Sequence, residues 1–278
     1  MELMKTEDMQ QPTKAVAIET FELNRRFGSL VAVDNLNLRV SLGTVFGLLG
    51  TNGAGKSTTI KMLTTLLPAS TGTARVAGFD IIRQPQEVRR NIGYVSQMLS
   101  ADGQLTGYEN LLISAKLYGI PRMEREKCIR QALDFMELSR VASTLVSHYS
   151  GGMIRRLEIA QSMLHRPAIL FLDEPTVGLD PVAKHSVWQR IRYLRQEYGT
   201  TIFMTTHDME EADKLCDHVA FMHHGSIVAL DSPLKLRNTI GPEATLDDVF
   251  IHCTGTSIDE RGNYRDAART RHTAERVE

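Results

Sequence analysis

The sequence lacks any long apolar run. Its most apolar stretches, such as 44–50 and 168–172, have the length of a strand, whereas a helix that crosses a membrane needs about 20 apolar residues. The start of the chain, MELMKTEDMQQ, mixes acids with polar residues and contains no apolar signal segment. We therefore expect a cytoplasmic protein, which reaches the cytoplasmic face of the membrane only if another chain brings it there.

Cysteine and net charge are also scarce. The three cysteines, Cys128, Cys216 and Cys253, are far apart and fit neither a metal site nor a disulfide framework, so we expect reduced thiols. The 32 Lys and Arg residues nearly balance the 33 Asp and Glu residues, which argues against binding nucleic acid through bulk charge. With 42% hydrophobic residues, the 278 residues can form a sizeable core.

Strand-like patterns recur along the chain and alternate with helical patterns. The expected strands lie at 15–18, 31–33, 36–40, 44–49, 92–95, 168–172, 201–205 and 218–222. This alternation predicts an α/β fold, with a largely parallel sheet covered by helices. Between about 105 and 150 the pattern is helical, and it begins at a capping box of Thr106 and Glu109. We interpret this segment as a helical lobe inserted into the α/β domain.

Two of the expected helices have well-defined ends. The first starts near Lys56 and ends before Pro68. The second has Asp180 as its N-cap, Pro181 in its first turn and Gly199 at its exit. From the helical period we expect two sets of buried residues, which are Ile60, Leu63 and Leu67 in the first helix and Val187, Ile191, Leu194 and Tyr198 in the second.

The loop between the strand at 44–49 and the first of these helices matches G-x-x-x-x-G-K-[ST]. Its glycines let backbone N–H groups face a phosphate chain, and the helix adds its positive N-terminal end. Lys56 would reach the β- and γ-phosphates, and the Ser57 hydroxyl would bind Mg²⁺. A chance turn is the alternative, but the flanking strand and helix favour a phosphate loop. The candidate nucleotide-binding residues here are Gly50, Thr51, Asn52, Gly53, Ala54, Gly55, Lys56, Ser57 and Thr58.

Two adjacent carboxylates, Asp173 and Glu174, follow the buried strand at 168–172. The carboxyl ends of parallel strands face the ligand crevice of an open sheet. Asp173 is therefore placed to hold Mg²⁺, and Glu174 to polarise the attacking water. Without other evidence the pair could be an acidic strand exit that caps the next helix. The phosphate loop favours the interpretation as a metal ligand and a base.

A second glycine signal, YSGGM at 149–153, precedes a helix expected at 154–166. Ser150 can cap that helix, and the two glycines allow a ligand to approach its N-terminus closely. By itself such a segment could be a capped turn with no ligand. It becomes informative only together with the other motifs and their order.

The order of the motifs resembles that of the ATP-binding subunits of ABC transporters, over about 15–232. GTNGAGKS looks like the Walker A loop and ILFLDE like Walker B. YSGGM looks like the LSGGQ signature, from which Tyr149 and Met153 depart. Gln97 looks like the glutamine of the Q-loop, and His207 looks like the histidine of the H-loop.

The resemblance implies roles for these residues. Gln97 would touch Mg²⁺ or the attacking water, and His207 would contact the γ-phosphate. Asp180 lies in a segment that looks like the D-loop, and Phe27 stands where the family has an aromatic residue, usually tyrosine, that stacks on adenine. The signature residues of one copy, which are Ser150, Gly151, Gly152 and Met153, would close over the phosphate loop of another copy. Two ATP molecules would then lie in a head-to-tail dimer.

For the fold, the resemblance implies a P-loop NTPase (RecA-like) core with a parallel sheet, an N-terminal antiparallel β subdomain and an inserted α-helical subdomain at about 98–160. We expect a flexible N-terminus at 1–14, an ATP-binding domain at 15–232, and a C-terminal extension at 233–278 that ends in a disordered tail. The cofactors would be ATP and Mg²⁺.

A closer resemblance, carried by SGGMIRRLEIA and HRPAILFLDEPTVGLDP, is to the branch that exports drugs, antibiotics, polysaccharides or signal molecules. It implies that the chain powers export through a separate integral membrane permease, which docks on the helical lobe. Two alternatives stay open. One is a soluble ABC ATPase that acts on translation, DNA repair or cluster assembly. The other is a regulatory module that binds ATP without hydrolysing it, against which the intact Glu174 and His207 argue.

Overall fold

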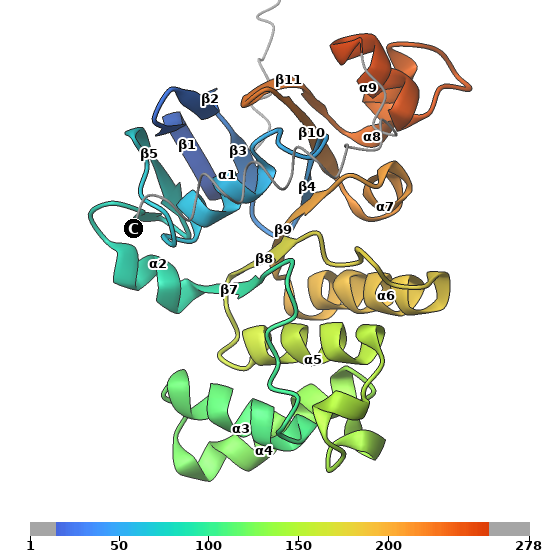
Figure 1. Cartoon of the computed structure of the whole chain (residues 1–278). Coiled ribbons are helices and arrows are strands. Elements are labelled where there is room, and N and C mark those ends of the chain that lie inside the picture. The colour runs from blue at the N-terminus through green and yellow to red at the C-terminus, as the bar shows by residue number, and fades with distance from the viewer. Residues whose placement is uncertain (1–14, 256–278) are drawn as a thin grey trace, which may run out of the picture.

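The computed structural model describes residues 15–255, which form two sheets and a separate group of helices (Figure 1). The expected flexible N-terminus at 1–14 lies outside the described residues, as does the part of the expected tail beyond 255. Across the described part of the chain, no helix combines the length and the apolar character that crossing a bilayer requires.

The first sheet is antiparallel, as expected for an N-terminal β subdomain. Its strands run in the order β2-β1-β5-β6, and β3 pairs with β1. Their bounds are β1 Val16–Phe27, β2 Leu30–Leu36, β3 Arg39–Ser41, β5 Thr71–Val76 and β6 Phe79–Asp80. The prediction of one strand at 36–40 was wrong. The Thr20 hydroxyl donates to the Leu36 carbonyl and accepts from the Leu38 N–H, and the chain changes from one strand to the next there.

The second sheet is parallel except for one edge strand, which confirms the predicted largely parallel sheet. Its order is β11-β10-β4-β9-β8-β7, and only β11 runs antiparallel to its neighbour. The bounds are β4 Val45–Leu49, β7 Ile92–Val95, β8 Ile169–Asp173, β9 Thr201–Thr206, β10 His218–His223 and β11 Ser226–Asp231. The carboxyl ends of β4, β9 and β8 therefore lie side by side.

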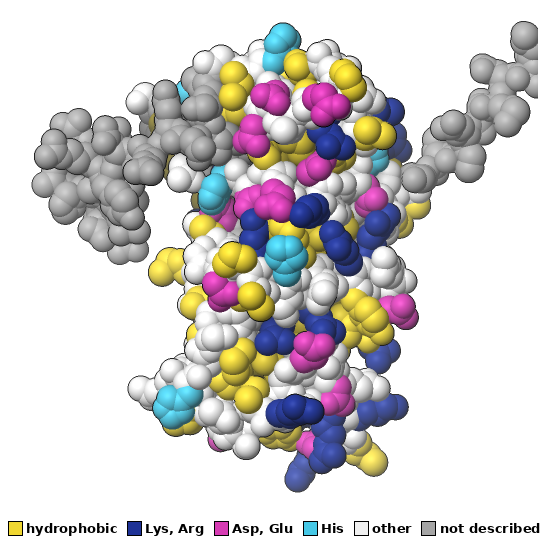
Figure 2. Space-filling model, turned by 90° about the vertical axis from the view of Figure 1, so that its right-hand side faces the viewer, with side chains coloured by type: hydrophobic (Ala, Val, Ile, Leu, Met, Phe, Trp, Pro, Cys, Tyr) yellow, Lys and Arg dark blue, Asp and Glu magenta, His cyan; other side chains and the backbone are white. Residues whose placement is uncertain are grey.

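The helices form the layers around this sheet and the lobe at the lower end of Figure 1. Their bounds are α1 Lys56–Leu63, α2 Pro85–Asn91, α3 Gly107–Leu117, α4 Arg122–Phe135, α5 Gly151–Met163, α6 Pro181–Tyr198, α7 Met209–Leu215, α8 Pro233–Asn238 and α9 Leu246–Thr254, with two short 3₁₀ helices at Ser139–Val141 and Val146–His148. The predicted capping box of Thr106 and Glu109 starts α3. On the face shown in Figure 2, acidic and basic side chains are interspersed, and Lys and Arg gather over the lobe.

The central strands are apolar throughout because both faces of the parallel sheet are covered. Phe171 and Phe203 belong to the core that contains α1 and the antiparallel sheet. Leu172 and Met204, one position further along, belong to the core that contains α5 and α6. Phe250 of α9 packs edge-on against Phe221 with ring centroids 5.5 Å apart, so the described part of the C-terminal extension joins this second core.

Two expectations need correction, one about the buried face of α6 and one about the end of α1. Tyr198 is 56% exposed, since it is the last residue of α6 and contacts Phe135 at the surface, whereas Trp188 is buried instead. The first helix ends at Leu63 because the Thr64 hydroxyl donates to the Ile60 carbonyl and Thr65 adopts a positive φ of 63°. The other residues expected on these faces are buried or packed against a core.

Candidate functional site

The phosphate loop connects β4 to α1, and two of its glycines are required by close contacts. A Cβ atom at Gly50 would lie 2.3 Å from the Met222 carbonyl oxygen, and one at Gly55 would lie 2.3 Å from the Ala32 carbonyl oxygen. Gly55 also has a φ of 108°, which residues with a side chain rarely adopt. The loop can therefore curl against β10 and β2 only with glycine at these two positions.

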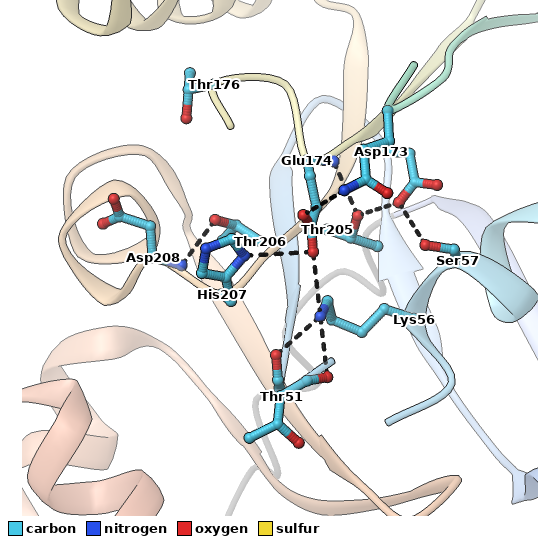
Figure 3. Close-up of polar contacts among 12 residues, drawn as sticks. Thr51, Lys56, Ser57, Asp173, Glu174, Thr176, Thr205, Thr206, His207 and Asp208 are labelled. Carbon is cyan, nitrogen blue, oxygen red and sulfur yellow. Dashed lines mark hydrogen bonds and ion pairs between the residues drawn. The ribbon is translucent and has the colours of Figure 1, made fainter. Parts of the chain in front are cut away.

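Lys56 begins α1, and its side chain turns back over the loop (Figure 3). Its Nζ donates to the Gly50 carbonyl at 2.9 Å and to the Thr51 carbonyl at 3.2 Å, and it lies 3.3 Å from Glu174 Oε1. Burial lowers the pKa of Lys56, and the charges of Glu174 and Asp173 act in the opposite direction. A buried cation thus lies between the loop backbone and the carboxylates.

Ser57 and Asp173 meet on the other side of Lys56. The Ser57 hydroxyl donates to Asp173 Oδ1 at 3.0 Å, and the Thr205 hydroxyl donates to the same oxygen at 2.6 Å. A carboxylate with an adjacent hydroxyl is the oxygen donor set that Mg²⁺ uses when nucleotide phosphates supply its remaining ligands. The chemistry of these donors fits the expected magnesium site.

Glu174 is held in an unusual backbone conformation, with a φ of 49°. Its N–H donates to the Thr205 carbonyl and hydroxyl, each at 3.1 Å. Its carboxylate accepts from Gln97 Nε2 at 3.1 Å, and His207 Nδ1 lies 3.4 Å away (Figure 3). The structure therefore brings Gln97 and His207 from separate loops to one carboxylate, with Lys56 as the third contact.

The electrostatics of this cluster favour a charged carboxylate. Burial acts to raise the pKa of Glu174, but the contacts with His207 and with Lys56 outweigh it and lower the pKa. The contact with Glu174 raises the pKa of His207. An ionised carboxylate that also has a histidine partner can accept a proton or orient a water molecule beside a phosphate.

Phe27 lies outside this cluster, at the end of β1. Its ring is 44% exposed, and the guanidinium of Arg25 lies 4.5 Å from its centroid. The adjoining strand β2 runs beside the phosphate loop, as the contact between Gly55 and Ala32 indicates. An exposed aromatic ring beside the loop is available for stacking on a base.

The signature residues start α5 on the helical lobe. Ser150 caps the helix by accepting from the Met153 N–H at 3.3 Å. A Cβ atom at Gly152 would lie 2.6 Å from the Ala183 Cβ, so this glycine lets α5 approach the start of α6. Within residues 15–255, no hydrogen bond or ion pair joins the signature to the phosphate loop. Asp180 serves as the N-cap of α6, as predicted.

Sequence reasoning missed several residues beside the site. The Thr205 hydroxyl donates to the Asp173 carboxylate and accepts from the Glu174 backbone N–H, and the only signal for it was a polar residue at the end of a buried strand. Buried Glu211 accepts from the Thr176 hydroxyl at 2.7 Å and from Trp188 Nε1 at 2.9 Å. A pocket of about 190 Å³ adjoins Glu174 and His207 and is lined in part by Thr176 and Glu211.

Comparisons with known proteins show the family of the chain. A family model described as ABC transporter matches residues 33–177. The daunorubicin/doxorubicin resistance ATP-binding protein DrrA of Streptomyces peucetius is 44% identical over 231 residues, which are 83% of this chain and 69% of that protein. The Nod factor export ATP-binding protein I of Sinorhizobium fredii is 42% identical over 221 residues, which are 80% of this chain and 64% of that protein.

A solved structure of cbiO1 from Clostridium perfringens, described as part of the ABC transporter complex cbiONQ, superposes with a TM-score of 0.74 and 26% identity. The similarity covers 80% of this chain and 91% of that one. This likeness agrees with the expected P-loop NTPase fold. Family model, relatives and fold agree, so the chain belongs to the ABC transporter family, as one of its ATP-binding, ATP-hydrolysing subunits.

Proposed function

We propose that the chain powers export of a small molecule through a separate membrane permease, by hydrolysing ATP between two copies of itself. The observation that carries the catalytic part is the set of contacts around Glu174, whose carboxylate meets Lys56, Gln97 and His207. Similarity to a drug resistance protein and to a Nod factor exporter supports export as the direction.

The phosphate loop would hold the nucleotide through its backbone N–H groups and through Lys56. The ammonium would exchange the Gly50 and Thr51 carbonyls for phosphate oxygens, which are stronger acceptors. Ser57 and Asp173 would hold Mg²⁺, and bound magnesium neutralises the charge that develops on the phosphates. Phe27 would stack on the adenine, and its neighbour Arg25 would stay on the opposite face of the ring.

Glu174 would orient the attacking water and accept its proton. His207 would hold the carboxylate in position and contact the γ-phosphate, which fits the 3.4 Å separation between its Nδ1 and Glu174 Oε1. Gln97 would bind the other carboxylate oxygen until nucleotide and metal arrive. Catalysis of this kind depends on positioning and charge stabilisation rather than on a covalent intermediate.

The signature would act on the phosphate loop of a second copy. Ser150 and the two following glycines stand at the N-terminus of α5, where backbone N–H groups can bind an anion. Because they make no polar contact with the phosphate loop of their own chain within 15–255, a head-to-tail dimer would supply the missing half of each site. Asp180 and its loop would lie at the same interface.

The permease would dock on the helical lobe and on the segment after Gln97. Apolar side chains are exposed there at Met98, Leu99, Leu117 and Met123. Large apolar side chains at the surface are typical of protein contact surfaces. This contact would keep the chain at the cytoplasmic face of the membrane.

The domain boundaries follow from the same proposal. Residues 15–232 would form the ATP-binding unit, with the lobe at about 98–160 as the part that transmits movement. The extension from 233 would brace this unit, since Leu246, Val249 and Phe250 pack into its core. We assign it no separate activity.

Replacing Glu174 by Gln tests the proposed reaction. This change keeps the size of the side chain and removes the base, so ATP hydrolysis should fall by about 100-fold or more while ATP binding persists. Glu210→Gln, an exposed residue of the same type paired with Lys214, is the control and should leave the rate unchanged. Equal hydrolysis by wild type and Glu174→Gln would contradict the proposal and favour a module that only binds ATP.

Docking is tested by purification from membranes with Leu117→Glu and Leu66→Glu. Both leucines are exposed, but only Leu117 lies on the lobe. An integral membrane protein should accompany the wild type and Leu66→Glu, and it should be lost with Leu117→Glu. If no such protein accompanies the wild type, the transport part of the proposal is wrong.

A further inference from the structure

Helix α5 carries a buried ion pair one turn beyond the signature. Arg155 Nη1 lies 3.0 Å from Glu158 Oε2, and the two residues are 2% and 4% exposed. A buried ion pair is a poor source of stability, because removing both charges from water costs as much as their attraction returns. We therefore expect the pair to serve another purpose, through the other groups that its two side chains bind.

Both side chains form hydrogen bonds with the segment that follows β7. Arg155 Nη1 donates to the Ser96 carbonyl at 2.6 Å, and Nη2 donates to the Gln97 carbonyl at 2.9 Å. Glu158 Oε1 accepts from the N–H of Ser100 and from its hydroxyl, the latter at 3.1 Å. The pair thus fixes both ends of the segment 96–100, which belongs to no helix or strand.

Gln97 lies within the segment 96–100, and its amide donates to Glu174 Oε2 at 3.1 Å. One residue is therefore bound by its carbonyl to the signature helix and by its side chain to the carboxylate beside the phosphate loop. The guanidinium is suited to this task, since its planar fork can donate to two carbonyls and a carboxylate at once, which a lysine cannot do.

The pKa of Arg155 is lowered, chiefly by burial. The negative charges of Glu158 and Asp173 act to raise it. Asp173 belongs to the proposed metal site, so the charge on α5 is already within electrostatic reach of the reacting groups.

We propose that Arg155 and Glu158 are positioning residues, which set the Gln97 amide against Glu174 and make its position depend on where α5 stands. This inference rests on the proposed function, since it assumes that Gln97 and Glu174 act in hydrolysis.

The test is a mutant cycle on the full-length chain, with steady-state ATP hydrolysis and nucleotide affinity as readouts. We call Arg155 and Glu158 together the clamp. The clamp variant Arg155→Met/Glu158→Leu replaces the pair by apolar side chains of similar size, which a folded core often tolerates. We expect kcat to fall by about tenfold or more with KM for ATP nearly unchanged, because a misplaced group costs rate rather than binding. Arg156→Lys, on the same helix but bound to the Met136 carbonyl, is the control and should keep the wild-type rate.

Gln97→Ala supplies the second arm of the cycle. If the clamp acts through Gln97, adding the clamp changes to Gln97→Ala should lower kcat no further. Losses that multiply, or a clamp variant with the wild-type kcat, would overturn the inference. Should the double replacement fail to fold, Arg155→Lys carries the same cycle with the charge retained.

Parallel measurement of Glu174→Gln separates the two levels of the proposal. If Glu174→Gln hydrolyses ATP normally, the proposed function itself is wrong. If Glu174→Gln is inactive while the clamp variants behave as wild type, only the positioning role is wrong.

Discussion

Lys56 Nζ lies 3.3 Å from Glu174 Oε1, with both side chains almost fully buried. The proposed phosphate-binding cation and the proposed base are thus in direct contact, although Lys56 starts α1 and Glu174 follows β8. This contact couples nucleotide binding to the state of the carboxylate, because an ATP phosphate would draw the ammonium away from Glu174.

Lys56→Ala should weaken ATP binding. The variant loses charge-assisted hydrogen bonds to phosphate of about 1.5–3 kcal/mol, which correspond to a rise in Kd of about 10- to 100-fold. Titration with a fluorescent ATP analogue measures this Kd. Lys61→Ala, an exposed position on the same helix, is the control. Unchanged affinity and turnover in Lys56→Ala would refute the interpretation of the loop.

Gly55→Ala should destabilise the fold more than Gly53→Ala. Both glycines have positive φ, but only the new Cβ at Gly55 would collide with a backbone oxygen, that of Ala32 at 2.3 Å. We expect a cost of about 1–3 kcal/mol in the free energy of unfolding for Gly55→Ala. Urea unfolding monitored by circular dichroism gives both values, and an equal loss in the two variants would argue against the close contact.

Trp188→Phe should destabilise the core around Glu211. The indole N–H donates to Glu211 Oε1 at 2.9 Å, and this carboxylate is buried. Burial raises the pKa of Glu211, so the loss of a donor leaves a polar group that is hard to satisfy. The expected loss is about 1–3 kcal/mol in the free energy of unfolding. Tyr193→Phe on the same helix, at an exposed position, should change little.

The contact between His207 and Glu174 predicts a pH-dependent stability. The pKa of His207 is raised above its ordinary value of 6.5, so the contribution of His207 is complete below that value and is lost as pH rises through the raised pKa. The pKa of Glu174 is lowered below 4.5, so its contribution is complete above 4.5 and is lost as pH falls through the lowered pKa.

The stability difference between wild type and His207→Ala should therefore be largest between pH 4.5 and 6.5 and shrink as pH rises through the raised pKa of His207. Urea unfolding at a series of pH values measures it. Lys56 and Asp208 also face His207 and act on its pKa in opposite directions. A difference that grows with pH would show that the imidazole is not held in its charged form by Glu174.

The sequence by itself determined several local features whose residues are contiguous. The phosphate loop, the capping box at Thr106 and the N-cap at Asp180 were predicted because their chemistry depends on spacings of a few positions. The strands at 44–49 and 201–205 were predicted because a parallel strand covered on both faces is apolar throughout. The end of α1 was missed because a threonine side chain bond and one positive φ outweighed the helical pattern.

Only the tertiary structure decided which distant segments meet. The strand order puts β9 between β4 and β8, so that Thr205 lies where it can bind both Asp173 and Glu174. Nothing in the linear order of the strands specifies this arrangement, since β9 follows both of the strands that it separates. The hydrogen bond from Arg155 to the Gln97 carbonyl was likewise decided by the tertiary structure, because it depends on the packing of α5 beside the end of β7.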